Sequence, residues 1–154
     1  MGQIDKRLGE LGITLPAAAK PVATYVPWVR TGNLVFISGQ GPIVDGKITL
    51  QGCLGDTVSL ENGIKSARLC AINVLAQLKD ACGGDLDRVT RVVKLLGFVN
   101  ATPSFADHPK VINGASDLMV EVFGEKGKHA RSAVASPSLP FGISTEVEAI
   151  IEVE

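Results

Sequence analysis

The strongest constraint on the fold is an alternating pattern at the end of the chain. Every second position there is small or apolar: Val147, Ala149, Ile151 and Val153. The positions between them hold three glutamates and an isoleucine: Glu146, Glu148, Ile150 and Glu152. Because successive side chains of a β-strand point to opposite faces, this segment predicts a strand with one apolar and one acidic face. The apolar face must be covered, so the strand should belong to a sheet that packs on helices.

A second strand is expected just before it, around Arg131. This arginine stands among small residues, Ala130, Ser132 and Ala133, which leave room beside its guanidinium for a small carboxylate. Arginine offers a bidentate fork for such a group, and Glu146 on the following strand could handle a proton or a water. The alternative is that Arg131 and Glu146 form a simple ion pair on a sheet face.

His129 is the other candidate base near Arg131. Side chains alternate along a strand, and we expect His129 to point to the face opposite Arg131. This disfavours a catalytic role for it.

Two helices are predicted from apolar residues that recur every three or four positions. The first spans about 57–82, with Thr57 or Ser59 as N-cap candidates and Gly83-Gly84 as its end. The second spans about 104–123, with Gly124 after its last turn. Between them, residues 88–99 are apolar on both faces, which indicates a strand covered on both sides.

The first third of the chain predicts a short helix followed by hairpins. Ile4, Leu8 and Leu11 have helical spacing, and the segment from Pro16 to Pro21 should end that helix. Residues 22–30 and 34–38 indicate strands joined by a turn at Gly32-Asn33. Residues 43–48 should extend this antiparallel meander through a turn at Asp45-Gly46. The whole order gives two β-α-β halves in one α+β domain.

Composition excludes several classes of protein. The 154 residues carry a net charge of −1 with a pI near 6.1, and no basic face suits nucleic acid or an anionic membrane. Cys53, Cys70 and Cys82 show no C-x-x-C spacing, so neither a disulfide framework nor a zinc site is indicated. Cys70 and Cys82 are expected in the core. No signal peptide or membrane span is recognisable, and a cytoplasmic location is the default expectation. The hydrophobic content of 45% favours an oligomer.

Several motifs together resemble the RidA/YjgF family. They are Tyr25 with the run Gly32 to Gln40, residues 84–89, Ala130-Arg131-Ser132, Leu139-Pro140, and Glu146 to Ile150. The resemblance implies a chorismate-mutase-like fold: a mixed, mainly antiparallel sheet with two helices on one face. It further implies a homotrimer with a central barrel and clefts between subunits. The characteristic activity is hydrolysis of 2-imino and enamino acids to 2-oxo acids and ammonia, without metal or organic cofactor.

The resemblance also assigns roles to residues of this chain. Arg131 matches the carboxylate-binding arginine and Glu146 the glutamate that positions water. The expected substrate-binding positions are Tyr25, which would close the cleft, Ser38, Gly39, Asn113 and Ala133. The partner would therefore be a small carboxylate-bearing imine.

The chain departs from the family pattern at two places. Residues 1–21 form an N-terminal helical extension before a RidA-like domain at 22–154. Trp28 and Arg30 are expected at the cleft mouth, or else as a half-buried sheet residue and a solvated strand end. These changes keep a second function open, a non-catalytic small-carboxylate-binding or regulatory trimer. Ribonuclease activity ranks last.

Overall fold

One mixed five-stranded sheet forms the centre of the fold. The computed structural model describes residues 1–20 and 22–154, so Pro21, the last residue of the expected extension, lies outside the described residues. The strands are β1 (Trp28–Thr31), β2 (Leu34–Gln40), β5 (Val89–Asn100), β6 (Ala130–Ser136) and β7 (Thr145–Val153). They are ordered β1-β2-β7-β5-β6. Only β5 and β6 run parallel, which confirms the predicted mixed, mainly antiparallel sheet.

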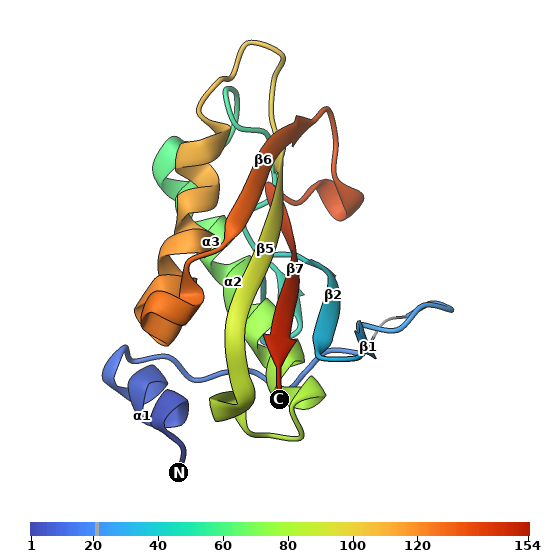
Figure 1. The fold of residues 1–154 in the computed structure, drawn as a ribbon. Coiled ribbons are helices and arrows are strands. Elements are labelled where there is room, and N and C mark those ends of the chain that lie inside the picture. The colour runs from blue at the N-terminus through green and yellow to red at the C-terminus, as the bar shows by residue number, and fades with distance from the viewer. Residues whose placement is uncertain (21) are drawn as a thin grey trace.

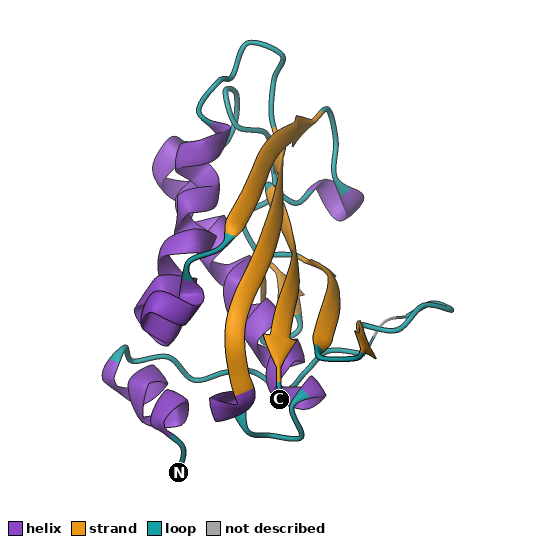
Figure 2. Cartoon of the chain, in the orientation of Figure 1, coloured by secondary structure: helices purple, strands orange, loops and turns teal. Residues whose placement is uncertain are grey.

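Two long helices, α2 (Leu60–Ala81) and α3 (His108–Phe123), cover one face of this sheet (Figures 1 and 2). In α2, the Ser59 side chain accepts a hydrogen bond from the amide of Asn62, so one of the two expected caps is confirmed. The helix ends before Gly83, whose φ is +66°. The apolar alternation of β7 faces these helices, since Val147 and Ile151 are fully buried. The strand predicted from the final segment is confirmed with its acidic face outward.

The second helix begins later than the periodicity predicted. It starts at His108 rather than near Ser104, and Pro109 lies in its first turn. Proline lacks an amide hydrogen and is tolerated only there, where that hydrogen has no helical partner. The helix ends at Phe123, and Gly124 follows with a φ of +61°, as predicted.

The first hairpins correct two expectations. β3 (Ile43–Val44) and β4 (Lys47–Ile48) pair with each other in a separate two-stranded sheet and do not extend the main meander. The β1–β2 turn at Gly32-Asn33 is confirmed. However, β1 begins only at Trp28. Residues 22–26 are exposed, Pro27 is half-buried, and this segment extends away from the sheet (Figure 1).

The N-terminal helix α1 (Gln3–Glu10) is docked on the same core. Leu8 is buried there, and the Asp87 carboxylate accepts from the amides of Gln3 and Ile4, both at 2.8 Å. Asp87 belongs to the short 3₁₀ segment η1 (Leu86–Arg88), and Asp5 forms an ion pair with Lys79 of α2 at 2.8 Å. The division of the chain after residue 21 stays a prediction.

Two further 3₁₀ segments are η2 (Gly124–Gly127) and η3 (Pro140–Gly142). In the described ranges, no helix combines the length and apolarity needed to cross a bilayer.

Candidate functional site

Arg131 is held by side chains of α3. Its Nη1 donates to Asn113 Oδ1 at 2.7 Å and to Ser116 Oγ at 3.2 Å. Asn113 and Ser116 are neighbours on one face of the helix because they are three residues apart. Asn113, expected as a substrate-binding residue, therefore lies beside Arg131, whereas Ser116 was not among the expected residues. Its position one helical turn after Asn113 was the sequence feature from which its place beside Arg131 could have been predicted.

The sheet register places Arg131 on the helix side of β6. Arg131 lies opposite Leu95 of β5, and Ala133 lies opposite Gly97. Leu95 is fully buried in the core, and directly opposite residues point to the same face of a sheet. Arg131 and Ala133 therefore face α3, at the edge strand of the sheet.

His129 faces the same way, which corrects the sequence-based expectation. Its Nε2 lies 2.9 Å from Ser116 Oγ, the hydroxyl that also contacts Arg131. The physical reason is spacing, because residues two apart in extended chain share a face. We call Asn113, Ser116, His129, Arg131 and Ala133 the arginine half-site.

Glu146 lies on the other face of the sheet, beside a β-bulge. Ile37 pairs with Ala149 and Gln40 with Val147, so Ser38 and Gly39 of β2 share the single partner position of Glu148. Such a bulge redirects the chain locally. A Cβ on Gly39 would come within 2.6 Å of Glu146 Oε1, so the glycine leaves the space that the carboxylate occupies. We call Ser38, Gly39, Glu146 and Glu148 the glutamate half-site.

The environment of Glu146 disfavours its charged form. Burial raises the pKa of its carboxyl, and the neighbouring charge of Glu148 raises it further. Among the described residues, the Glu146 carboxylate has no hydrogen-bond or ion-pair partner. A partly buried, unpaired carboxylate with a raised pKa is suited to general acid–base chemistry.

The two half-sites do not meet within one chain, and the simple ion pair considered from the sequence is absent from the described residues. Arg131 aligns with Leu95 and Glu146 with Phe98 on the intervening strand β5. They are three residues apart along β5 and two strand spacings apart across it, roughly 10 Å in each direction. Their side chains also point to opposite faces.

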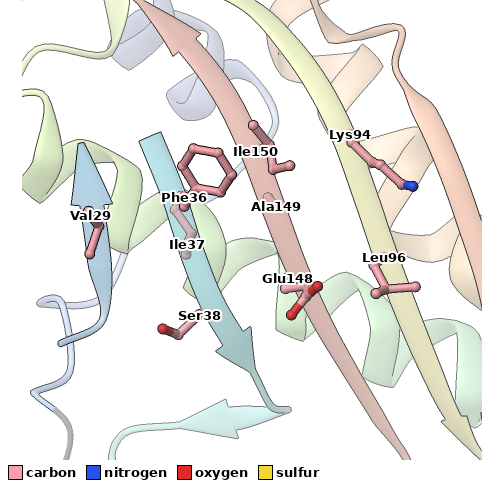
Figure 3. Close-up of a pocket in the computed structure, with 9 residues that line it drawn as sticks. All are labelled: Val29, Phe36, Ile37, Ser38, Lys94, Leu96, Glu148, Ala149 and Ile150. Carbon is pink, nitrogen blue, oxygen red and sulfur yellow. The ribbon is translucent and has the colours of Figure 1, made fainter. Parts of the chain in front are cut away.

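The outer face of the sheet carries a hollow of about 460 Å³ over β1, β2, β5 and β7. Glu148, Lys94, Phe36 and Ile150 line it, and Figure 3 shows these side chains on one face of the strands. Phe36 is 41% exposed there. This face therefore has a partly apolar surface that helices do not cover.

Trp28 and Arg30, which are expected at the cleft mouth, make hydrogen bonds within the chain. Trp28 Nε1 donates to Asp80 Oδ2 at 2.9 Å, and the ring packs against the core. Arg30 donates to the main-chain oxygens of Gly32 and Glu154, both at 3.0 Å. Within the single chain, Trp28 is half-buried and Arg30 is exposed at the end of β1, as the structural alternative expected. Their place at a cleft mouth between subunits stays a prediction.

Tyr25 lies on the segment that extends from β1 and is 59% exposed. Ser38 attaches this segment to β2, because its Oγ donates to the carbonyl of Val26 at 3.1 Å. Its amide also donates to Pro27 O at 2.9 Å. The Tyr25 side chain is therefore presented to the outside of the chain.

The cysteines lie away from both half-sites or within the core. Cys70 and Cys82 are buried, as predicted, and burial raises the pKa of the Cys70 thiol to about 12. Cys53 is half-buried. Across the described ranges, no three His, Cys, Asp or Glu side chains gather as metal ligands would.

Known proteins share this chain's sequence and fold. Residues 5–152 match a family model described as "YjgF/chorismate mutase-like, putative endoribonuclease". Protein TCP17 of Trypanosoma cruzi is 48% identical over 98% of this chain and 94% of its own. The crystal structure of Atu1372 from Agrobacterium tumefaciens, a protein of unknown function, is 49% identical with a TM-score of 0.93, covering 98% of this chain and 92% of its own.

A relative with a stated reaction is the 2-iminobutanoate/2-iminopropanoate deaminase of Dermatophagoides farinae. It is 29% identical over 92% of this chain and 95% of its own. The family match covers both half-sites, the sheet and both long helices. The chain therefore belongs to the YjgF family and has its chorismate-mutase-like fold.

Proposed function

We propose that this protein hydrolyses 2-imino and enamino acids to 2-oxo acids and ammonia. The observation that carries the proposal is that the hydrogen-bond partners of Arg131 are neutral. Its contacts are the neutral Asn113 and Ser116 side chains, so no carboxylate among the described residues compensates its positive charge. By contrast, Arg68 of α2 faces Glu121 at 2.9 Å. A substrate carboxylate would supply the missing partner.

The complete site would form between subunits of a homotrimer. Arg131 and Glu146 point to opposite faces of one sheet, so neither can reach a small substrate held by the other. In a cyclic trimer, each interface brings different surfaces of two copies together. The arginine half-site of one subunit would then face the glutamate half-site of the next. The uncovered outer sheet face, with Phe36 and Ile150, suits burial in a central barrel.

The chemistry uses one carboxylate anchor and one acid–base group. Arg131 would hold the substrate carboxylate and so position C2. Glu146, in its ionised form, would take a proton from a water that attacks C2 of the iminium. Glu146 would then give that proton to the nitrogen of the resulting carbinolamine. As the C–N bond breaks, Glu146 would take the hydroxyl proton, so that ammonia leaves and the 2-oxo acid is the other product. An enamine would first accept a proton at C3, for which protonated Glu146 is suited.

The deaminase named among the relatives supports this reaction class. The alternative is a trimer that binds small carboxylates without turnover. It drew its support from Trp28 and Arg30, whose contacts with Asp80 and Glu154 also fit a purely structural role.

The deciding experiment measures the lifetime of imino acids made in situ. An amino-acid oxidase supplies the imine, semicarbazide traps what escapes, and ammonia and 2-oxo acid are followed over time. We expect Arg131→Ala to lose about 2 to 5 kcal/mol of transition-state stabilisation, because a desolvated charge pair is lost. Glu146→Gln should keep carboxylate binding and lose turnover.

The control is Arg68→Ala, which removes an arginine whose partner Glu121 lies on the helix layer. It should leave the rate unchanged. No acceleration by the intact protein over several imino acids would contradict the proposal. If that protein still bound 2-oxo acids through Arg131, the carboxylate-binding function would replace it.

A further inference from the structure

The arginine half-site contains a directional chain of hydrogen bonds. His129 Nδ1 lies 2.6 Å from the carbonyl oxygen of Gly127, which can only accept, so Nδ1 carries a hydrogen. In the neutral ring, Nε2 is then an acceptor, and the Ser116 hydroxyl donates to it across 2.9 Å. The same hydroxyl oxygen accepts from Arg131 Nη1. Each donor in this series of hydrogen bonds, from Arg131 to Gly127, has its own acceptor.

The two ends of this series of hydrogen bonds are attached to closely packed backbone. A Cβ on Gly127 would collide with the carbonyl of Met119 of α3. A Cβ on Gly114 would likewise collide with the carbonyl of Ile64 of α2. These glycines let η2 and α3 approach their neighbours closely, so Ser116 and the Gly127 carbonyl are held in place. His129 is half-buried between them.

This arrangement decides which part of the guanidinium remains for a ligand. Nη1 carries two hydrogens, and both are used, by Asn113 at 2.7 Å and Ser116 at 3.2 Å. In the described part of the chain, Nε and Nη2 of Arg131 have no partner. A bidentate carboxylate needs two adjacent N–H groups. The Nε–Nη2 edge is the one such pair in which both N–H groups remain for a ligand.

We propose that Ser116 and His129 are positioning residues for Arg131. Together with Asn113 they hold Nη1, and the guanidinium then presents its Nε–Nη2 edge to the substrate carboxylate. The inference rests on the proposed role of Arg131 as carboxylate anchor. Neutral His129 serves this arrangement, because an imidazolium would donate from Nε2 and the Ser116 hydrogen would lose its acceptor.

The test compares two probes that differ at one group, 2-oxobutanoate and 2-oxobutanamide, by calorimetry. We expect Ser116→Ala to weaken 2-oxobutanoate binding roughly tenfold, because one hydrogen bond to a charged group is lost, and to leave 2-oxobutanamide binding unchanged. His129→Gln should act in the same direction. In turnover, KM should rise while kcat stays close to wild type. Ser116→Thr keeps the hydroxyl and should restore binding, and Ser104→Ala is the matched control on an exposed serine.

A spectroscopic measurement tests the edge itself. In the wild-type protein, saturation with 2-oxobutanoate should shift the ¹H–¹⁵N signal of Arg131 Nε, assigned by its loss in Arg131→Lys. An unshifted Nε signal at saturation would overturn the assignment of the edge.

Three binding outcomes would overturn the positioning role. In the first, Ser116→Ala and His129→Gln both bind 2-oxobutanoate within twofold of wild type while Arg131→Ala does not bind it. The positioning role would then fail, and the proposed function of Arg131 as carboxylate anchor would stand. In the second, both probes weaken equally, which indicates general disruption. In the third, Arg131→Ala binds as well as wild type, and the proposed function fails too. When Ser116→Ala causes no further loss of kcat/KM in an Arg131→Ala background, the coupling is supported.

Discussion

The two half-sites are built by different means. In the arginine half-site, hydrogen bonds from α3 hold the charged group, at 2.7 and 3.2 Å from Arg131 Nη1. In the glutamate half-site, no described side chain holds the charged group, and the bulge at Ser38 and Gly39 only makes space for it. One half orients a cation, whereas the other leaves a carboxylate unpaired and partly desolvated.

This difference matches the two tasks of the proposed reaction. An anchor must keep one geometry, and fixed neutral partners do this without cancelling its charge. A general base must change protonation state, and burial with a like charge nearby brings the pKa of Glu146 upward, toward neutral pH. The largest predicted effects should therefore come from separating the halves, and the smallest from residues outside both.

Mixing subunits gives the largest expected effect. Arg131→Ala and Glu146→Gln should each be nearly inactive alone. After unfolding and refolding together, about a quarter of the sites in randomly mixed rings would combine an intact arginine with an intact glutamate from the next subunit. Recovery of activity, followed by ammonia release, would locate each site between two subunits. No recovery in proven mixed trimers would contradict the shared site.

Gly39→Ala should damage the glutamate half-site alone. The added Cβ would meet the flexible end of Glu146, 2.6 Å from Oε1, so the carboxylate must move while the fold can persist. We expect kcat to fall at least roughly tenfold, because a small misplacement of a reacting group is costly. Binding of 2-oxobutanoate should be retained. Gly9→Ala, where nothing lies within 4 Å of the new Cβ, is the control.

Glu148→Gln should shift the pH dependence of turnover. The charge of Glu148 is the smaller of two causes that raise the pKa of Glu146. The proposed base is active when ionised, so activity falls as pH drops through that pKa. Removing the charge lowers the pKa of Glu146, and the acid limb of the kcat/KM profile should move to lower pH. An unmoved or upward-shifted limb would argue against Glu146 as the base.

Asp87→Ala should leave both half-sites intact. The amides of Gln3 and Ile4 lower the pKa of Asp87, so its stabilising contribution is present at neutral pH and is lost as pH falls through the lowered pKa. The variant should increase hydrogen exchange in α1 and keep wild-type turnover. The control is Glu61→Ala, which removes an exposed ion pair with Lys65. It should change neither hydrogen exchange in α1 nor turnover. Lost turnover in Asp87→Ala would connect α1 to the site.

Local patterns predicted most of the secondary structure. The alternation in β7, the apolar stripe of α2 and the Gly32-Asn33 turn were sufficient because each depends on residues close in sequence. Errors arose where a distant contact decides the outcome. The β3–β4 hairpin could pair with the main sheet or alone, and the apolar content of Ile43 and Ile48 does not distinguish these pairings. Likewise, the indole of Trp28 is directed by Asp80, 52 positions away.

The candidate site divides in the same way. The sequence by itself determined which residues carry charge and which strands and helices hold them, including Arg131 on one strand and Glu146 on another. Only the tertiary structure decided that β5 lies between these strands and that the two side chains face opposite sides of the sheet. It also decided that Ser116 and His129 gather at Arg131. Strand order and facing depend on pairing between distant segments, which short-range spacing does not specify.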